Sequence, residues 1–114
     1  MFEQVEFTAV PGPKTDRDIQ ILALSTCGFC KRGMEFLQAQ GFAYRFVYLD
    51  LVDYERKLQV KEEFKTTFNS SLSYPALILD RSKFTIGFIR KFWEELLGIE
   101  SEDEAAEAKL LEEE

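Results

Sequence analysis

The chain has 114 residues, enough for one domain, and 46% of them are apolar, including 11 phenylalanines. This composition supplies one core and excludes disorder of the whole chain. The net charge of −7 argues against nucleic-acid binding, and the lack of histidine excludes Ser-His, Cys-His and histidine-ligated metal chemistry. Because Cys27 and Cys30 are the only cysteines, any thiol chemistry must take place there.

The first 18 residues are expected to form an N-terminal arm. The stretch Val5–Val10 alternates apolar and polar residues and favours a short edge strand or a docked segment. Glu3 and Glu6 precede any basic residue, and no apolar run approaches 18 residues. This pattern favours neither a signal peptide nor a membrane span, so we expect a cytoplasmic protein with no membrane partner.

Residues 19–99 are expected to form the folded domain, which begins with a strand, a helix and a second strand. The apolar run Ile19–Leu24 is typical of a buried strand. Cys30, Met34 and Leu37 then share one helix face, and Gly41 is placed to end the helix. A second apolar run, 42–49, completes a βαβ unit with parallel strands.

The rest of the domain predicts a helix, a hairpin and a last helix. Residues 53–68 can form an amphipathic helix, and strands at 76–79 and 83–88 can pair around a turn. The last helix ends at Gly98. The full order is β-α-β-α-β-β-α. The face of the first of these helices is expected to contain Tyr54, Leu58, Phe64 and Phe68. The apolar stripe of the last contains Ile89, Phe92, Trp93, Leu96 and Leu97, of which the last four are expected in the core.

Residues 100–114 are expected to form an acidic, solvated, marginally stable helical tail. Ser101 and Glu104 fit a capping box, but little apolar surface is available for docking. This segment holds eight acidic residues against Lys109, whereas residues 1–99 carry 13 charges of each sign. The net charge therefore belongs to the tail, and the argument against nucleic acid rests on the lack of a basic stripe.

The Cys27-x-x-Cys30 pair is the clearest functional signal. A thiol attacks a disulfide as the thiolate, which a positive potential favours. Cys27 is expected at a helix N-terminus, with Lys31 and Arg32 following as thiolate-activating residues. Cys30, one turn on, can close a disulfide with Cys27. We therefore expect Cys27 to attack and Cys30 to resolve the mixed disulfide.

Pro75 is the second signal, because it opens an apolar strand after a polar loop. A proline at a strand start is tolerated in any sheet. A cis Tyr74-Pro75 bond would also turn the backbone N–H and C=O of Tyr74 towards an extended substrate. Next to the cysteine pair, we favour this cis, substrate-facing conformation.

Together these motifs resemble the glutaredoxin branch of the thioredoxin superfamily. The resemblance covers residues 19–98 and rests on three motifs: Cys27-Gly28-Phe29-Cys30 after a buried strand, Tyr74-Pro75 before a hairpin, and Gly87-Phe88 before the last helix. It implies a thioredoxin fold of the α/β class, with a central four-stranded mixed sheet flanked by helices. It also implies that Pro75 is a cis proline facing the active site and that Tyr74, Gly28, Phe29, Gly87 and Phe88 bind substrate.

The sequence departs from the family pattern at three places. Thr26 stands where thioredoxins have Trp, and Ser25 stands where many glutaredoxins have a Lys that contacts glutathione. Gly87-Phe88-Ile89-Arg90 replaces a Gly-Gly-x-x-Asp signature. Gly87-Phe88 is similar instead to glutaredoxin-like proteins that reduce ribonucleotide reductase and accept electrons from thioredoxin reductase.

The sequence thus predicts a thiol-disulfide oxidoreductase that reduces protein or glutathione mixed disulfides, with no bound cofactor and no metal. Its electron donor would be glutathione, as a co-substrate, or a thioredoxin-reductase-like flavoenzyme. The alternative is a dimeric iron-sulfur cluster or metal-binding protein, since Cys27-Gly28-Phe29 also resembles monothiol glutaredoxins, although those have Ser at the position of Cys30. A third class is a non-catalytic adaptor, in which the cysteines are inert.

Overall fold

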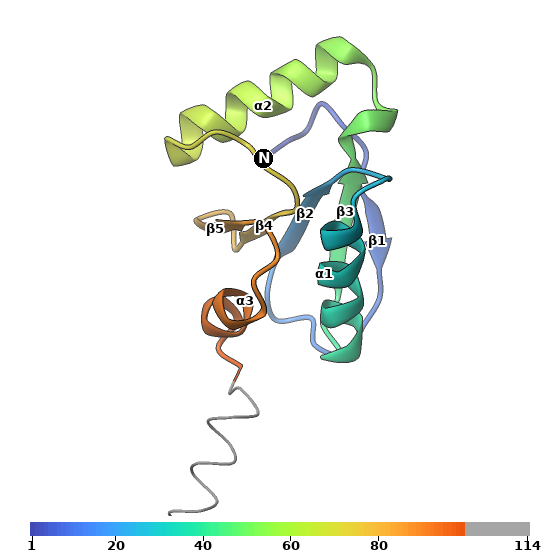
Figure 1. The fold of residues 1–114 in the computed structure, drawn as a ribbon, viewed down its shortest axis with the longest axis vertical. Helices are drawn as coiled ribbons and strands as arrows, with labels where there is room; N and C mark the ends of the chain where they lie inside the picture. Colours follow the sequence, from blue (N-terminus) through green and yellow to red (C-terminus); the bar gives the residue numbers. More distant parts are fainter. Residues whose placement is uncertain (100–114) are drawn as a thin grey trace, which may run out of the picture.

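A computed structural model describes residues 1–99 as a mixed sheet with helices on both faces (Figure 1). The predicted order β-α-β-α-β-β-α is confirmed from β2 to α3, with one strand before it and a 3-10 turn inserted. The elements are β1 (Thr8–Val10), β2 (Ile19–Ala23), α1 (Gly28–Ala39), β3 (Tyr44–Tyr48), the turn η1 (Leu49–Leu51), α2 (Tyr54–Phe68), β4 (Ala76–Leu79), β5 (Lys83–Ile86) and α3 (Arg90–Leu97).

The sheet has the strand order β1-β3-β2-β4-β5. Strands β2 and β3 are parallel, as the βαβ prediction requires, and every other pairing is antiparallel. Strand β3 is shorter than the predicted run 42–49, because the chain turns into η1 after Tyr48. Since β2 and β3 are parallel, the loops that follow them leave from the same end of the sheet, where the cysteine pair begins.

The expected central four-stranded mixed sheet is present, and the short edge strand that the stretch Val5–Val10 favours adds a fifth strand, β1. Strand β1 pairs antiparallel with β3, with Thr8 opposite Phe46, so the N-terminal arm extends the sheet as an edge strand. Phe2 and Val5, before β1, are buried in the core cluster on the α2 side of the sheet. The N-terminal arm pairs with β3 and thereby covers an edge strand that would otherwise be open. Its buried residues also fill the layer beneath α2.

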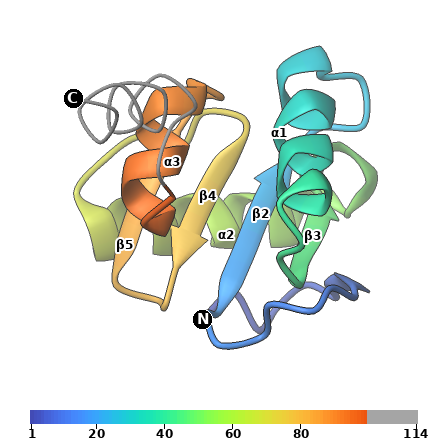
Figure 2. The ribbon, with the colours of Figure 1, turned by 90° about the horizontal axis from the view of Figure 1, so that it is seen from below.

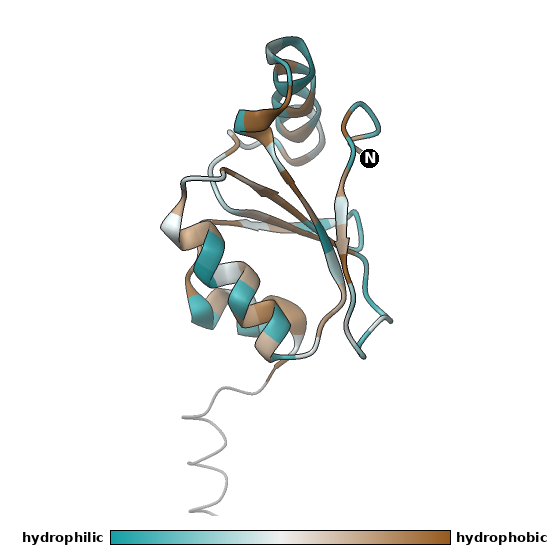
Figure 3. Cartoon of the chain, turned by 90° about the vertical axis from the view of Figure 1, so that its right-hand side faces the viewer, coloured by the Kyte–Doolittle hydropathy of each residue, from teal (hydrophilic) through white to brown (hydrophobic). Residues whose placement is uncertain are grey.

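The core has two layers, one on each face of the sheet. Figure 2 places α1 and α3 on the near face and α2 on the far face, and in Figure 3 the apolar strands run between these two layers. Side chains alternate along β2: Ile19, Ile21 and Ala23 belong to the α1 and α3 layer, whereas Leu22 belongs to the α2 layer. Both faces of β2 are thus buried, which explains its continuous apolar run.

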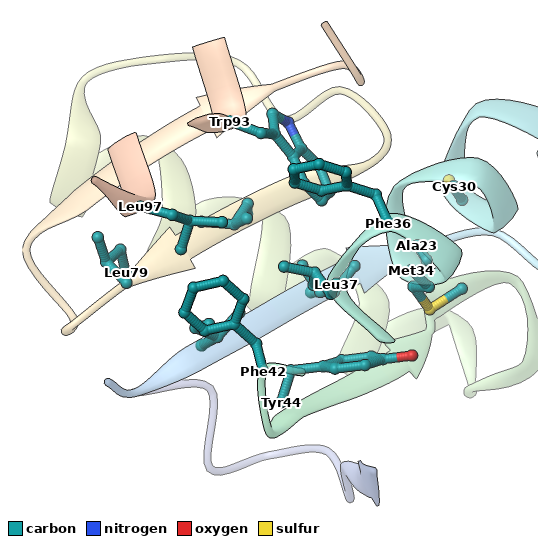
Figure 4. Close-up of a cluster of buried hydrophobic side chains, with 13 residues drawn as sticks. Ala23, Cys30, Met34, Phe36, Leu37, Phe42, Tyr44, Leu79, Trp93 and Leu97 are labelled. Carbon is teal, nitrogen blue, oxygen red and sulfur yellow. The ribbon is translucent and has the colours of Figure 1, made fainter. Parts of the chain in front are cut away.

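Helix α1 buries the face that the sequence predicts. Cys30, Met34 and Leu37 all belong to the core cluster on that side of the sheet (Figure 4). The chain leaves the helix through Gly41 at φ 81°, a left-handed conformation that glycine adopts without strain. Because Cys30 lies on this buried face, it is less accessible than Cys27.

Two predicted helix faces need correction. In α2, Phe64 is buried as predicted, but Tyr54 and Leu58 are 74% and 44% exposed, and Val60, which the predicted face left out, is buried. In α3, Phe92 is 50% exposed and is not in the core, whereas Trp93 and Leu97 are buried. Each helix covers the sheet with one side only, so an apolar stripe wider than that side leaves residues in solvent.

The predicted acidic tail, 100–114, lies outside the described residues. Among residues 1–99, no helix is long and apolar enough to span a membrane.

Contact between Gly33 and Trp93 gives a stability prediction. A Cβ on Gly33 would lie 2.6 Å from the Trp93 ring, whereas a Cβ on Gly28 in the same helix would meet open space. We expect Gly33→Ala to lower the free energy of unfolding by about 1–3 kcal/mol, since overpacking forces the buried indole to shift. Urea unfolding, followed by far-ultraviolet circular dichroism, measures the change.

Gly28→Ala is the matched control, and it should leave stability unchanged or raise it slightly, because alanine is the better helix former. Equal losses in the two variants would contradict the packing argument.

Candidate active site

Cys27 lies directly before α1 and caps it. Its backbone is extended, and its Sγ accepts a hydrogen bond of 3.2 Å from the Cys30 N–H. The sulfur therefore stands where the unpaired N–H groups of the first helical turn point, and that turn has no acidic residue. Because the Cys27 side chain is only half-buried, a substrate disulfide can approach its sulfur.

Cys30 lies one turn further on and is completely buried. Both cysteines are free thiols. Burial, followed by the interaction with the Cys27 sulfur, raises the pKa of the Cys30 thiol to about 12. A thiol in this environment stays protonated at neutral pH, so the two cysteines differ strongly in access and in environment.

Tyr74 and Pro75 lie at the same end of the sheet. The bond between them is cis, which confirms the prediction. Ala76 pairs with Leu22, near the end of β2, so the Tyr74-Pro75 segment lies beside the loop that leads to Cys27. The Tyr74 hydroxyl is buried without a hydrogen-bond partner among the described residues. Burial raises the pKa of Tyr74, and the negative charges of Asp50 and Cys30 raise it further.

Gly87 and Phe88 lie next to the Tyr74-Pro75 segment. The Gly87 N–H donates to the Pro75 carbonyl at 2.7 Å, and the Gly87 carbonyl accepts from Trp93 Nε1 at 2.9 Å. The Phe88 ring packs against the Phe36 and Trp93 rings, at centroid distances of 5.8 and 4.9 Å. The structure thus brings Gly87 and Phe88 next to Pro75 through one backbone bond and an aromatic cluster.

The remaining predicted site residues lie at the start of α1 on its exposed side. Gly28, Phe29, Lys31 and Arg32 are all exposed, Phe29 by 57%. The Arg32 guanidinium lies 4.5 Å from the centre of the Phe29 ring, a cation-π contact. Among residues 1–99, the ion pairs include neither Lys31 nor Arg32. Their thiolate-activating role stays a prediction.

Sequence reasoning missed one feature of the site, the contact between Ser25 and Asp50. The Ser25 N–H donates to Asp50 Oδ1 at 2.9 Å, and the Ser25 hydroxyl donates to Asp50 Oδ2. These bonds lower the pKa of the Asp50 carboxyl. A signal was present, because each residue follows a predicted parallel strand, and the carboxyl ends of parallel strands meet at one edge of a sheet.

Solved structures similar to this chain identify the family. Methanoredoxin from Methanosarcina acetivorans shares 31% identity, with 84% of this chain and 98% of that chain covered, at a TM-score of 0.71. The glutaredoxin from Methanosarcina mazei Go1 shares 27%, covering 83% and 90%, also at 0.71. The glutaredoxin from Archaeoglobus fulgidus shares 28%, covering 72% and 87%, at 0.62. The chain is a glutaredoxin-like member of the thioredoxin superfamily.

No family model and no curated protein matches the sequence. The thioredoxin fold that the motifs imply is confirmed by these structures. Together with the Cys27-x-x-Cys30 pair, they support thiol-disulfide oxidoreductase activity for this glutaredoxin-like protein.

Within residues 1–99 of the glutaredoxin-like protein, no group of three or more Cys, His, Asp or Glu side chains could surround a metal ion. A single described chain thus offers two cysteine ligands at most, fewer than a structural zinc site requires.

The difference between the cysteines predicts selective alkylation. At pH 8, iodoacetamide should modify Cys27 and leave Cys30 unmodified, because Cys30 is buried and its pKa is about 12. Peptide mass spectrometry of the native protein locates the adduct. Cys27→Ser should show almost no alkylation at this pH, and rapid labelling of Cys30 in that variant would contradict the assignment.

The Ser25 bonds predict a pH effect at Asp50. Ser25→Ala removes the largest contribution to the low pKa of Asp50, so the pKa should rise towards about 3.9. Carboxyl-carbon NMR titration measures this directly. Because the folded pKa lies below the unfolded one, the Ser25 hydroxyl stabilises the fold above about pH 4, and this part of the stability disappears as the pH falls through the folded pKa. An unchanged Asp50 titration in Ser25→Ala would contradict this explanation.

Proposed function

We propose that this glutaredoxin-like protein reduces disulfides in proteins, or mixed disulfides between proteins and glutathione, through its Cys27 and Cys30 dithiol. The asymmetry of the pair carries the proposal. Cys27 caps a helix and is accessible, whereas Cys30 is buried one turn away with its N–H on the Cys27 sulfur. Cys27 can thus attack a substrate disulfide, and Cys30 can attack the mixed disulfide that results.

The first step is attack by the Cys27 thiolate on one sulfur of the substrate disulfide. A bond forms between the Cys27 Sγ and that sulfur, the substrate S–S bond breaks, and its electron pair leaves on the second sulfur as a thiolate. The start of α1 favours the attacking anion, because Cys27 caps the helix and its sulfur accepts a hydrogen bond from the Cys30 N–H.

The second step releases the remaining half of the substrate. Cys30 loses its proton to water or to a departing thiolate, and its sulfur attacks the Cys27 Sγ. A disulfide forms between Cys27 and Cys30, and the bond between Cys27 and the substrate breaks, with the electron pair leaving on the substrate sulfur. In the free dithiol, burial and the nearby Cys27 sulfur raise the pKa of Cys30, and the effect of the Cys27 charge ends once Cys27 is in the mixed disulfide.

We propose that the substrate binds next to Cys27 through Tyr74, Pro75, Gly87, Phe88, Gly28 and Phe29. The backbone of Tyr74 and the ring of Pro75 supply one side, and Gly87 and Phe88 are joined to them through the Pro75 carbonyl. Gly28 and Phe29, the first two residues of α1, are exposed between the cysteines.

Two electrons must then return to the oxidised pair. We propose glutathione as a co-substrate or a thioredoxin-reductase-like flavoenzyme as the donor, with no bound cofactor. Such a cycle needs a compartment that keeps thiols reduced, for which the cytoplasm is our proposal.

Single cysteine variants test this mechanism. Cys27→Ser should lower reduction of a peptide-glutathione mixed disulfide by roughly 1000-fold or more, because no nucleophile is accessible. Cys30→Ser should still attack protein disulfides but should accumulate the mixed disulfide, which intact-protein mass spectrometry detects as an adduct. Turnover followed by release of glutathione provides the rate.

Activity that survives Cys27→Ser but not Cys30→Ser would reverse the two roles. Wild-type protein that reacts with no disulfide, and that shows visible absorbance and bound iron after anaerobic preparation, would replace the proposal with the cluster-binding alternative.

A further inference from the structure

An exposed carboxylate lies at the end of β3, close to the cysteine pair. Both oxygens of Asp50 accept hydrogen bonds from Ser25, one from the backbone N–H at 2.9 Å and one from the hydroxyl. These two bonds hold the carboxylate in one orientation. Among residues 1–99, none of the ion pairs includes Asp50, so its charge is not neutralised by direct contact there.

The chain geometry brings this charge to the site. Ser25 lies in the turn that leads to Cys27, and the Cys27 N–H donates to the Leu24 carbonyl at 3.2 Å, so the turn is tight. The negative charge of Asp50 also raises the pKa of the Tyr74 phenol, so Asp50 lies near the residue that precedes Pro75. Asp50 therefore belongs to the same small region as the two thiols and the residue that precedes Pro75.

The charge is present at every physiological pH. Hydrogen bonds from Ser25, and then the more distant charge of Lys57 on α2, lower the pKa of the Asp50 carboxyl. Lys31 and Arg32 are exposed in the first turns of α1, and the Arg32 guanidinium lies over the Phe29 ring. Asp50 is thus an anion that Ser25 holds in one orientation.

We propose that Asp50 determines substrate specificity, and that it favours disulfides flanked by positively charged residues over disulfides flanked by negatively charged ones. This inference deepens the proposed function and depends on it. A disulfide that reaches Cys27 brings its neighbouring residues past the Asp50 carboxylate. Attraction or repulsion then changes the rate of productive encounter, and the effect is screened by salt.

The test uses two synthetic peptides that differ only in charge. Each contains one cysteine in a mixed disulfide with the same neutral small thiol, flanked by two lysines in one peptide and by two glutamates in the other. The second-order rate constant is measured for fully reduced protein in a single turnover, by quantifying the released thiol. The ratio of the two rate constants cancels any change in Cys27 reactivity, because the same thiolate attacks both peptides.

Wild type should prefer the lysine peptide, and Asp50→Asn should lower the ratio about fivefold at low ionic strength. The control is Asp53→Asn, which removes the same charge a short distance along the chain, where Asn can still cap α2. It should leave the ratio nearly unchanged. In wild type, raising the salt to 1 M should shrink the preference towards one, because the screening length falls to about 3 Å.

An unchanged ratio in folded Asp50→Asn, or an equal fall in Asp53→Asn, overturns the inference. Should Asp50→Asn fail to fold, a wild-type ratio near one, or one that salt does not alter, overturns it equally. Failure of the proposed function is distinct, because wild-type protein would then react with neither peptide.

Discussion

The indole of Trp93 holds the parts of this active site together. It packs against Gly33 and Phe36 of α1, stacks edge-on against Phe88, and donates its N–H to the Gly87 carbonyl. Gly87 in turn donates to the carbonyl of Pro75. Helix α1, which Cys27 caps and which contains Cys30, is thereby placed against the segment that contains Pro75. A residue far from the reacting sulfurs thus sets the geometry in which they work.

The periodicity of the helix then gives the two thiols different surroundings. Cys27 precedes the helix, where its sulfur meets the N–H groups of the first turn, and Cys30 is carried onto the buried face with Met34 and Leu37. Separation by one turn keeps them close enough to bond and leaves them in different surroundings. The chemistry of a dithiol reductant follows from this difference in burial.

The electrostatics of the site depend on the start of α1 and the end of β3. The start of α1 favours an anion at Cys27, whereas the carboxylate at the end of β3 places a second negative charge nearby through Ser25. Glutaredoxins that carry Lys at the position of Ser25 have the opposite sign there. This chain therefore shares the redox pair and the fold of the family, with a different charge at the edge of the site.

The sequence by itself determined the order of elements from β2 to α3, the buried face of α1, the cysteine pair and the Tyr74-Pro75 segment, because each depends on local spacing or on residue type. Tertiary structure decided the fifth strand, since edge pairing of Thr8 with Phe46 joins distant segments. It also decided which side of α2 and α3 is buried: the exposure of Tyr54 and Phe92 depends on how much of each helix the sheet can cover. The Ser25 contact with Asp50 arose in the same way, because two strand ends meet only after the parallel pair has formed.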